Sequence, residues 1–178
     1  GHNSLSSSIP ACLIEKSRSL VVLDLHGNKL SRNIPNMLPR DCKLETLDLS
    51  FDQLEGTVPE YLVNCPKLKV LSLGHNRICS LFPWSSDKLY SMRVLVLLLN
   101  GFRGQISCPC SNYSWPDLQI INLASNKFRG VFSPKFLKLR CDDGGRWSNR
   151  FAAWEPALTR TSRSSYQSIL SRHGDHEL

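Results

Sequence analysis

Apolar residues return along the chain in a fixed order that repeats about every 24 residues. In one copy the apolar positions are Leu44, Leu47, Leu49 and Leu54. The other copies begin at Leu20, Leu68, Met92 and Leu118. A recurrence this regular is typical of a solenoid, in which each repeat is one structural unit that buries its apolar face against its neighbours.

The alternation within each copy predicts one short strand per repeat. Side chains alternate across a strand, so the leucines should fill the core while the residues between them face the other way. We therefore expect an α/β solenoid with one parallel β-sheet on its concave face and irregular or 3-10 segments on its convex face. Residues 1–140 would form about five repeats plus an N-terminal partial repeat.

A short polar residue follows each predicted strand. These residues are separated by 24, 24, 24 and 26 positions, and they are Asn28, Asp52, Asn76, Asn100 and Asn126. An amide at such a turn can satisfy backbone groups, and stacked copies would form a ladder. Asp52 accepts hydrogen bonds but cannot donate one when ionised, so its rung should be weaker or rely on a water.

A second pattern, in which glycine and proline follow an apolar residue, comes after the ladder position. It reads Leu54-Glu55-Gly56-Thr57-Val58-Pro59, with further copies beginning at Leu30 and Phe102 and a weaker one at Phe128. This version resembles the plant extracellular leucine-rich repeat subclass. Together with segments such as residues 115–126, it is similar to plant receptor-like proteins of the disease-resistance type over residues 1–140.

The resemblance implies a function in recognition. The parent protein would stand at the extracellular face of the plasma membrane, bind a peptide, protein or cell-wall ligand, and signal in defence or development through a co-receptor kinase. The alternatives are a soluble extracellular inhibitor of the polygalacturonase-inhibiting type and an ectodomain fragment of a receptor kinase. This fragment has no signal peptide or membrane span, so the membrane would be reached only through a missing C-terminal helix.

The predicted ligand-binding residues lie between the strand leucines. They are Val22, Asp24, His26, Thr46, Asp48, Ser50, Val70, Ser72, Val94, Val96, Leu98, Ile120 and Asn122. An acid–base site drawn from Asp24, Asp48, His26 and His75 is the alternative, but nothing in the sequence supplies a pocket that excludes water. We therefore expect binding without catalysis, and neither cofactor nor metal.

Charge and cysteine content refine this picture. The net charge of +7 would suit nucleic acid or an acidic cell wall, and the wall is favoured because no aromatic-interleaved basic stripe is visible. Seven cysteines are many for a cytosolic chain. Cys12, Cys42 and Cys65 precede strands, either as buried residues or as disulfide partners. A glycosylation sequon begins at Asn112 and supports a secreted location.

The periodicity ends abruptly after Leu139. Residues 141–178 are rich in arginine and serine, poor in aliphatic residues, and contain no further repeat. We expect this segment to be a disordered tail, or a foreign one that arose from a frameshift, a retained intron or a mispredicted exon.

Overall fold

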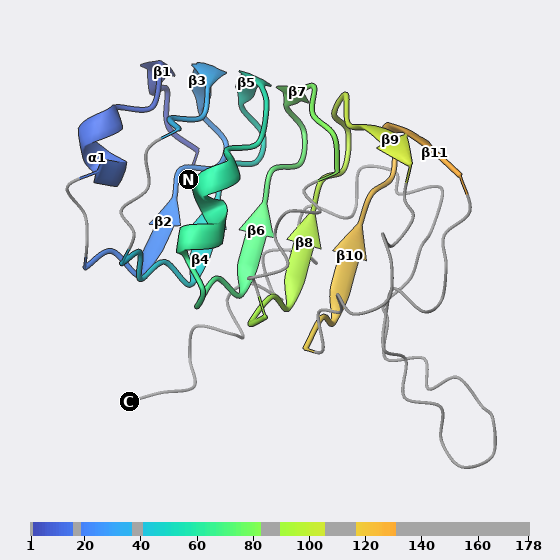
Figure 1. Cartoon of the computed structure of the whole chain (residues 1–178). Helices are drawn as coiled ribbons and strands as arrows, with labels where there is room; N and C mark the ends of the chain where they lie inside the picture. The colour runs from blue at the N-terminus through green and yellow to red at the C-terminus, as the bar shows by residue number, and fades with distance from the viewer. Residues whose placement is uncertain (1, 16–18, 37–40, 83–89, 106–116, 131–178) are drawn as a thin grey trace.

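A computed structural model of the chain describes residues 2–15, 19–36, 41–82, 90–105 and 117–130. These residues form a solenoid built from parallel strands, as the repeat pattern predicts (Figure 1). Its concave sheet has five strands, in the spatial order β10-β8-β6-β4-β2. The strands are β2 (Val22–Asp24), β4 (Thr46–Asp48), β6 (Val70–Ser72), β8 (Val94–Val96) and β10 (Ile120–Asn122).

Neighbouring coils of the concave sheet are in matching register. Leu23 pairs with Leu47, Leu47 with Leu71, and Leu71 with Leu95, and Leu95 pairs with Ile121. The first three steps are 24 residues long and the last is 26, and in each of them a strand residue lies beside its equivalent in the next coil. The inward-facing leucines therefore form continuous rows through the core.

The core consists of these rows together with apolar residues that follow the ladder positions. Leu49, Leu54, Leu73, Leu97 and Phe102 are completely buried. Burial of one such side chain stabilises the fold by about 1.5–3 kcal/mol. In a solenoid that stabilisation is shared between adjacent coils, so loss of one coil weakens the next.

A second layer of parallel strands was not predicted from the sequence, which indicated only one sheet. One sheet has the order β1-β3-β5-β7, and β9 pairs with β11 in another. Their bounds are β1 (Ser6–Ser7), β3 (Lys29–Asn33), β5 (Gln53–Gly56), β7 (Arg77–Ile78), β9 (Arg103–Gln105) and β11 (Lys127–Arg129). These strands are only two to five residues long, so they depend on coil stacking more than on local propensity.

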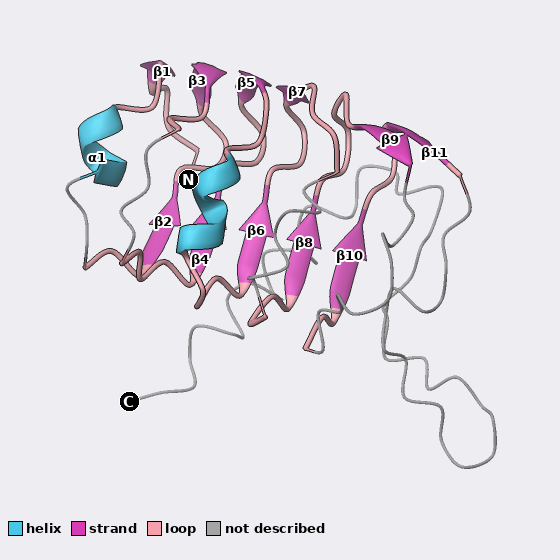
Figure 2. Ribbon diagram, viewed as in Figure 1, coloured by secondary structure: helices cyan, strands magenta, loops and turns pink. Residues whose placement is uncertain are grey.

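The convex side carries little helix. It holds α1 (Ala11–Glu15) and the 3-10 helix η1 (Glu60–Asn64), joined to the strands by loops (Figure 2). Within the described segments, no helix is long and apolar enough to cross a membrane.

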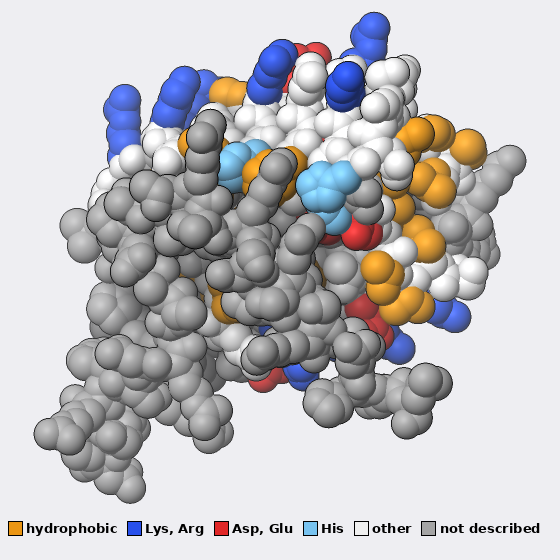
Figure 3. Space-filling view, turned by 180° about the vertical axis from the view of Figure 1, so that it is seen from behind, with side chains coloured by type: hydrophobic (Ala, Val, Ile, Leu, Met, Phe, Trp, Pro, Cys, Tyr) orange, Lys and Arg blue, Asp and Glu red, His pale blue; other side chains and the backbone are white. Residues whose placement is uncertain are grey.

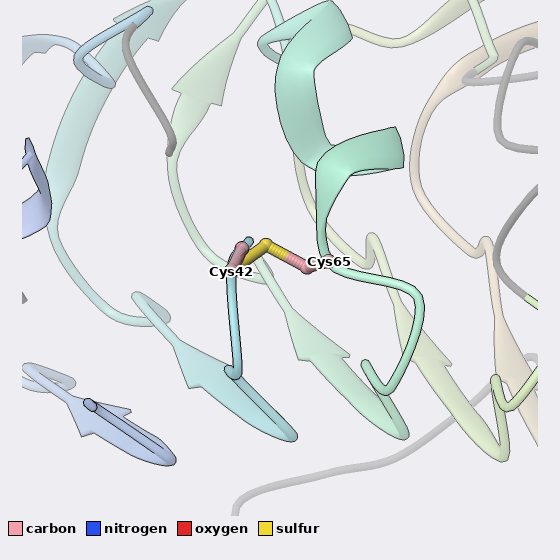
Figure 4. Close-up of a disulfide and its surroundings, with 2 residues drawn as sticks. All are labelled: Cys42 and Cys65. Atoms are coloured by element: carbon pink, nitrogen blue, oxygen red, sulfur yellow. A yellow bond between two sulfur atoms is a disulfide. The ribbon is translucent and has the colours of Figure 1, made fainter. Parts of the chain in front are cut away.

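A disulfide joins Cys42 to Cys65 on the convex side, where η1 ends (Figure 4). The Cα atoms are 4.7 Å apart and both side chains are buried. Cys12 is exposed and unpaired, so it does not stack with the other two. The reason is its place in the repeat: Cys42 lies two residues before Leu44 and Cys65 three before Leu68, but Cys12 lies eight before Leu20.

Candidate functional site

The residues that the sequence predicts for ligand binding lie in three parallel rows on the concave sheet. Val22, Thr46, Val70, Val94 and Ile120 form the first row, and Asp24, Asp48, Ser72, Val96 and Asn122 form the second. The third row continues beyond the strands, because backbone N–H groups still donate to the next coil, as from Gly27 to Ser50 and from His75 to Leu98. It holds His26, Ser50, Gly74, Leu98 and Ala124.

Chemical character changes along these rows. Asp24 of the first coil is exposed and Asp48 of the second is buried, whereas the fourth strand is apolar. Val96 and Leu98 of this coil are half-buried. Five of the residues predicted to bind a ligand are buried and so are not available on the face: Asp48, Ser50, Val70, Ser72 and Val94. The exposed apolar surface of this coil is at Leu99, of which 44% is accessible.

A small hydrogen-bonded turn recurs at the carboxyl end of three concave strands. Asp24 accepts a hydrogen bond from the His26 backbone N–H at 3.0 Å, and Asp48 accepts one from Ser50 at 3.0 Å. Asn122 accepts the equivalent bond from Ala124 at 3.2 Å. Short side-chain acceptors commonly bond to the backbone two residues ahead in this way. The turn fixes the orientation of each acidic or amide side chain on the concave face.

Side chains reinforce two of these turns. The His26 Nδ1 lies 2.6 Å from the Asp24 Oδ1, and the Ser50 hydroxyl donates to the Asp48 Oδ1 at 2.6 Å. Burial acts to raise the pKa of Asp24, but the hydrogen bonds from His26 and the charge of its imidazole outweigh that effect. The pKa of Asp24 therefore lies below its ordinary value, and this carboxylate stays ionised at neutral pH.

The structure brings Asp24, His26 and Asp48 together, with their ligand atoms within 4.8 Å of one another. His75, which the acid–base alternative also used, lies elsewhere, stacked on Phe51 with ring centroids 4.0 Å apart. The Asp24 and Asp48 Oδ1 atoms already accept hydrogen bonds from their own turns. Asp48 is buried and Asp24 is exposed, so Asp24 is the carboxylate of this cluster that a cationic or hydroxyl group can reach.

The asparagine ladder joins consecutive coils behind this face. The Oδ1 of Asn100 accepts from the Ile78 N–H of the preceding coil at 3.0 Å, and its Nδ2 donates to the Leu73 carbonyl at 2.8 Å. Asn76 and Asn126 make equivalent pairs of bonds. Each rung therefore satisfies a donor and an acceptor that the turn would otherwise leave unpaired.

The Asp52 rung has only half of this pattern. Its Oδ1 accepts from the Leu30 N–H at 2.8 Å, whereas its Oδ2 is buried without a partner. Burial raises the pKa of Asp52 to about 6, despite the backbone hydrogen bonds from Leu30 and Asn28 and the charge of His26, all of which act to lower it. A protonated Oδ2 could donate where the other rungs have an amide nitrogen.

One column of residues beside the concave face was not recognised from the sequence. The residue before each ladder position has a left-handed backbone, with φ between 53° and 67° at Gly27, Phe51, His75, Leu99 and Ser125. Only one of the five is glycine, although this conformation is uncommon for other residues. A shallow depression lined by His75, Leu99, Ser125 and the neighbouring asparagines lies along this column. Position in the repeat was the signal that could have identified it.

The predicted glycosylation site Asn112 and residues 131–178, which include the predicted tail, lie outside the described residues. Three further cysteines, Cys108, Cys110 and Cys141, lie outside them as well. These expectations remain predictions.

Comparison with known proteins agrees with the repeat architecture. Models of the leucine-rich repeat match residues 19–40 and 42–102. Receptor-like protein 54 of Arabidopsis thaliana is 34% identical over 175 residues, which is 95% of this chain. The chain spans only 21% of the length of that relative.

Two solved structures from the same organism have a similar fold. The ectodomain of the plant membrane receptor kinase GASSHO1/SCHENGEN3, in complex with CASPARIAN STRIP INTEGRITY FACTOR 2, is 25% identical with a TM-score of 0.64, over 71% of this chain and 15% of that one. A chain of the BIR3–SERK2 complex is 32% identical with a TM-score of 0.56, over 71% of this chain and 68% of that one.

Proposed function

Because the chain belongs to the plant receptor-like proteins built from leucine-rich repeats, we propose that its concave sheet recognises an extracellular peptide or protein ligand. The observation that carries this proposal is the set of three registered rows on the concave sheet. The exposed residues of these rows, such as Val22 and Asp24, do not pack in the core, so they can vary without loss of the fold. On a surface of this kind, the identity of the exposed side chains determines which ligand is bound.

The distribution of charge on the rows suggests how a ligand would lie. Asp24 carries negative charge on the first coil, and Leu99 exposes apolar surface three coils away. An extended segment with a basic group at one end and an apolar side chain at the other would complement both. The turn at Asp24 holds this acceptor in place before binding, which reduces the ordering cost of association.

Signalling would then depend on a partner. We expect the parent protein to act at the extracellular face of the plasma membrane in defence or development, with a co-receptor kinase supplied in trans. The BIR3–SERK2 complex, in which two plant proteins associate, supports a protein partner for a fold of this type. Members of this family typically act by binding, so we expect no catalysis from this chain.

The test uses random peptides displayed on phage, selected against the whole 178-residue chain. Selected peptides should lose binding to Asp24→Lys and Val96→Glu, which alter the second concave row. They should retain binding to Glu60→Lys, an exposed change on the convex helix η1. Peptides that bind the concave variants normally but lose binding to the convex variant would contradict the proposal.

A further inference from the structure

Charge is divided unevenly between the two layers of strands. The concave strands contain two aspartates and no lysine or arginine. The second layer, β3 to β11, has one acidic residue, Glu55, against six basic ones. We call these six the cationic stripe, and they are Lys29, Arg32, Arg77, Arg103, Lys127 and Arg129.

The stripe is exposed, and the one acidic residue within it is Glu55, the register partner of Arg77. All six side chains are exposed, and within the described segments none forms an ion pair or a side-chain hydrogen bond. Figure 3 shows Lys and Arg side chains in a row along the upper edge of the molecule, where the second layer lies. Coil stacking aligns these six residues, which come from β3, β7, β9 and β11.

Two of the cations are held against each other. Lys127 and Arg103 are direct register partners in the β9–β11 pair. Like charges directly opposite in a sheet destabilise it, because neither side chain can move far from the other. Neighbouring parallel strands are about 4.8 Å apart. Positive charge therefore recurs along the solenoid axis on β3, β7, β9 and β11, interrupted at β5, which carries Glu55. A bound polyanion would remove this repulsion.

We propose that the cationic stripe binds a linear acidic polysaccharide, a carboxylate-bearing chain that runs along the solenoid axis. The exposed polar residues beside the cations, Asn33, Gln53 and Gln105, provide amide groups that can hydrogen-bond sugar hydroxyls. The strands of the second layer carry no exposed aromatic side chain, which a single-stranded nucleic acid would use for stacking. The buried disulfide also fits an oxidising, extracellular location. This surface is separate from the proposed concave site.

The experiment measures binding of the whole chain to polygalacturonate by biolayer interferometry. The matched ligand is the same polymer fully methyl-esterified, which has the sugar backbone without the charge. We expect binding to the acidic polymer only, with affinity falling steeply as salt is added, because the contacts are exposed charges. No binding by the wild-type chain, or equal binding to both polymers, would overturn the proposal.

Charge-reversal variants test whether the polymer binds at the cationic stripe. The variant R77E/R103E/K127E should lose at least about tenfold in affinity, because local charge density governs such attraction. The control K43E/K67E/R93E reverses three exposed cations outside the second layer and has the same net charge, and it should lose less than about threefold. Equal losses in both variants would show an effect of net charge alone and would overturn the assignment.

Two further measurements test a neutral variant of the stripe and two other classes of polyanion. The neutral variant R103Q/K127Q removes the opposed cations without reversing charge, so it should fold at least as stably as the wild type while binding polygalacturonate more weakly. Unchanged affinity in this folded variant would count against the stripe. Tighter binding to single-stranded DNA or to polyglutamate than to polygalacturonate would replace the polysaccharide with a different class of partner.

Discussion

The carboxylate of Asp52 accepts a 2.8 Å hydrogen bond from the backbone N–H of Leu30, one coil away, with one oxygen while the other oxygen is buried without a partner. In the equivalent rungs, the amide nitrogens of Asn76, Asn100 and Asn126 donate to carbonyls of the preceding coil at 2.8–2.9 Å. Asp52 therefore completes the ladder by position but leaves it short of one donor. The buried oxygen makes this rung the weakest point among the ladder positions.

Replacing this carboxylate by the amide that the other rungs use should stabilise the protein. Asp52→Asn restores the missing donor, and we expect a gain of about 1–3 kcal/mol in the free energy of unfolding at pH 7. Urea unfolding followed by circular dichroism measures the gain. Asn100→Asp, which creates the same defect in an intact rung, should lose stability at that pH. A less stable Asp52→Asn protein would mean that Oδ2 already has a donor.

Stability should also depend on pH through Asp52. Burial raises its folded-state pKa to about 6 from an ordinary value of 3.8, so the folded state binds this proton more tightly than the unfolded state. The contribution of the proton is complete below pH 3.8 and is lost as the pH rises through 6, by up to about 3 kcal/mol.

The difference in unfolding free energy between Asp52→Asn and the wild type isolates this effect. It should be small near pH 4 and should grow to its full size by pH 7. Asp24, whose pKa is lowered, contributes in the opposite sense, because its stabilisation is lost as the pH falls. Asp24 is present in both proteins, so its contribution cancels in the difference. A difference that does not vary with pH would contradict the assignment to Asp52.

The disulfide should contribute substantially to stability. Cys42 and Cys65 are 23 residues apart, and closing a loop of this size restricts the unfolded chain by about 3 kcal/mol. Cys42→Ala/Cys65→Ala should therefore unfold at a lower urea concentration than the wild type. Cys12→Ser serves as the control, because this exposed thiol is unpaired and its change should have little effect. Equal loss in the control would point to intermolecular bonding instead.

A strained residue in β3 offers a route to a more stable chain. Arg32 has a φ of 67°, and the equivalent turns of later coils have Gly56, Gly104 and Gly130 with φ between 79° and 98°. Arg32→Gly should stabilise the fold by about 1 kcal/mol, because glycine adopts this conformation without steric cost. Thermal unfolding measures the change. Gly104→Ala, the reverse substitution in β9, should lower the melting temperature, and no change in either variant would contradict the strain.

The sequence alone determined the coil, the concave rows and the ladder. The spacing of Leu23, Leu47 and Leu71 fixes which residues face the core, because side chains alternate along a strand and the repeat length is constant. The same spacing identified Asp52 as the rung that lacks a donor. These properties depend only on local periodicity, which is directly visible in the order of residues.

Tertiary structure decided the features that depend on how the coils lie against one another. Cys42 and Cys65 occupy different positions of the repeat and meet only because the convex segments bring them together. Phe51 and His75 stack because they occupy the equivalent turn position in adjacent coils, each with a left-handed backbone. Lys127 and Arg103 are opposed because β9 and β11 pair in a second layer whose short strands have little sequence signal. Such contacts join residues more than 20 positions apart, so local pattern does not specify them.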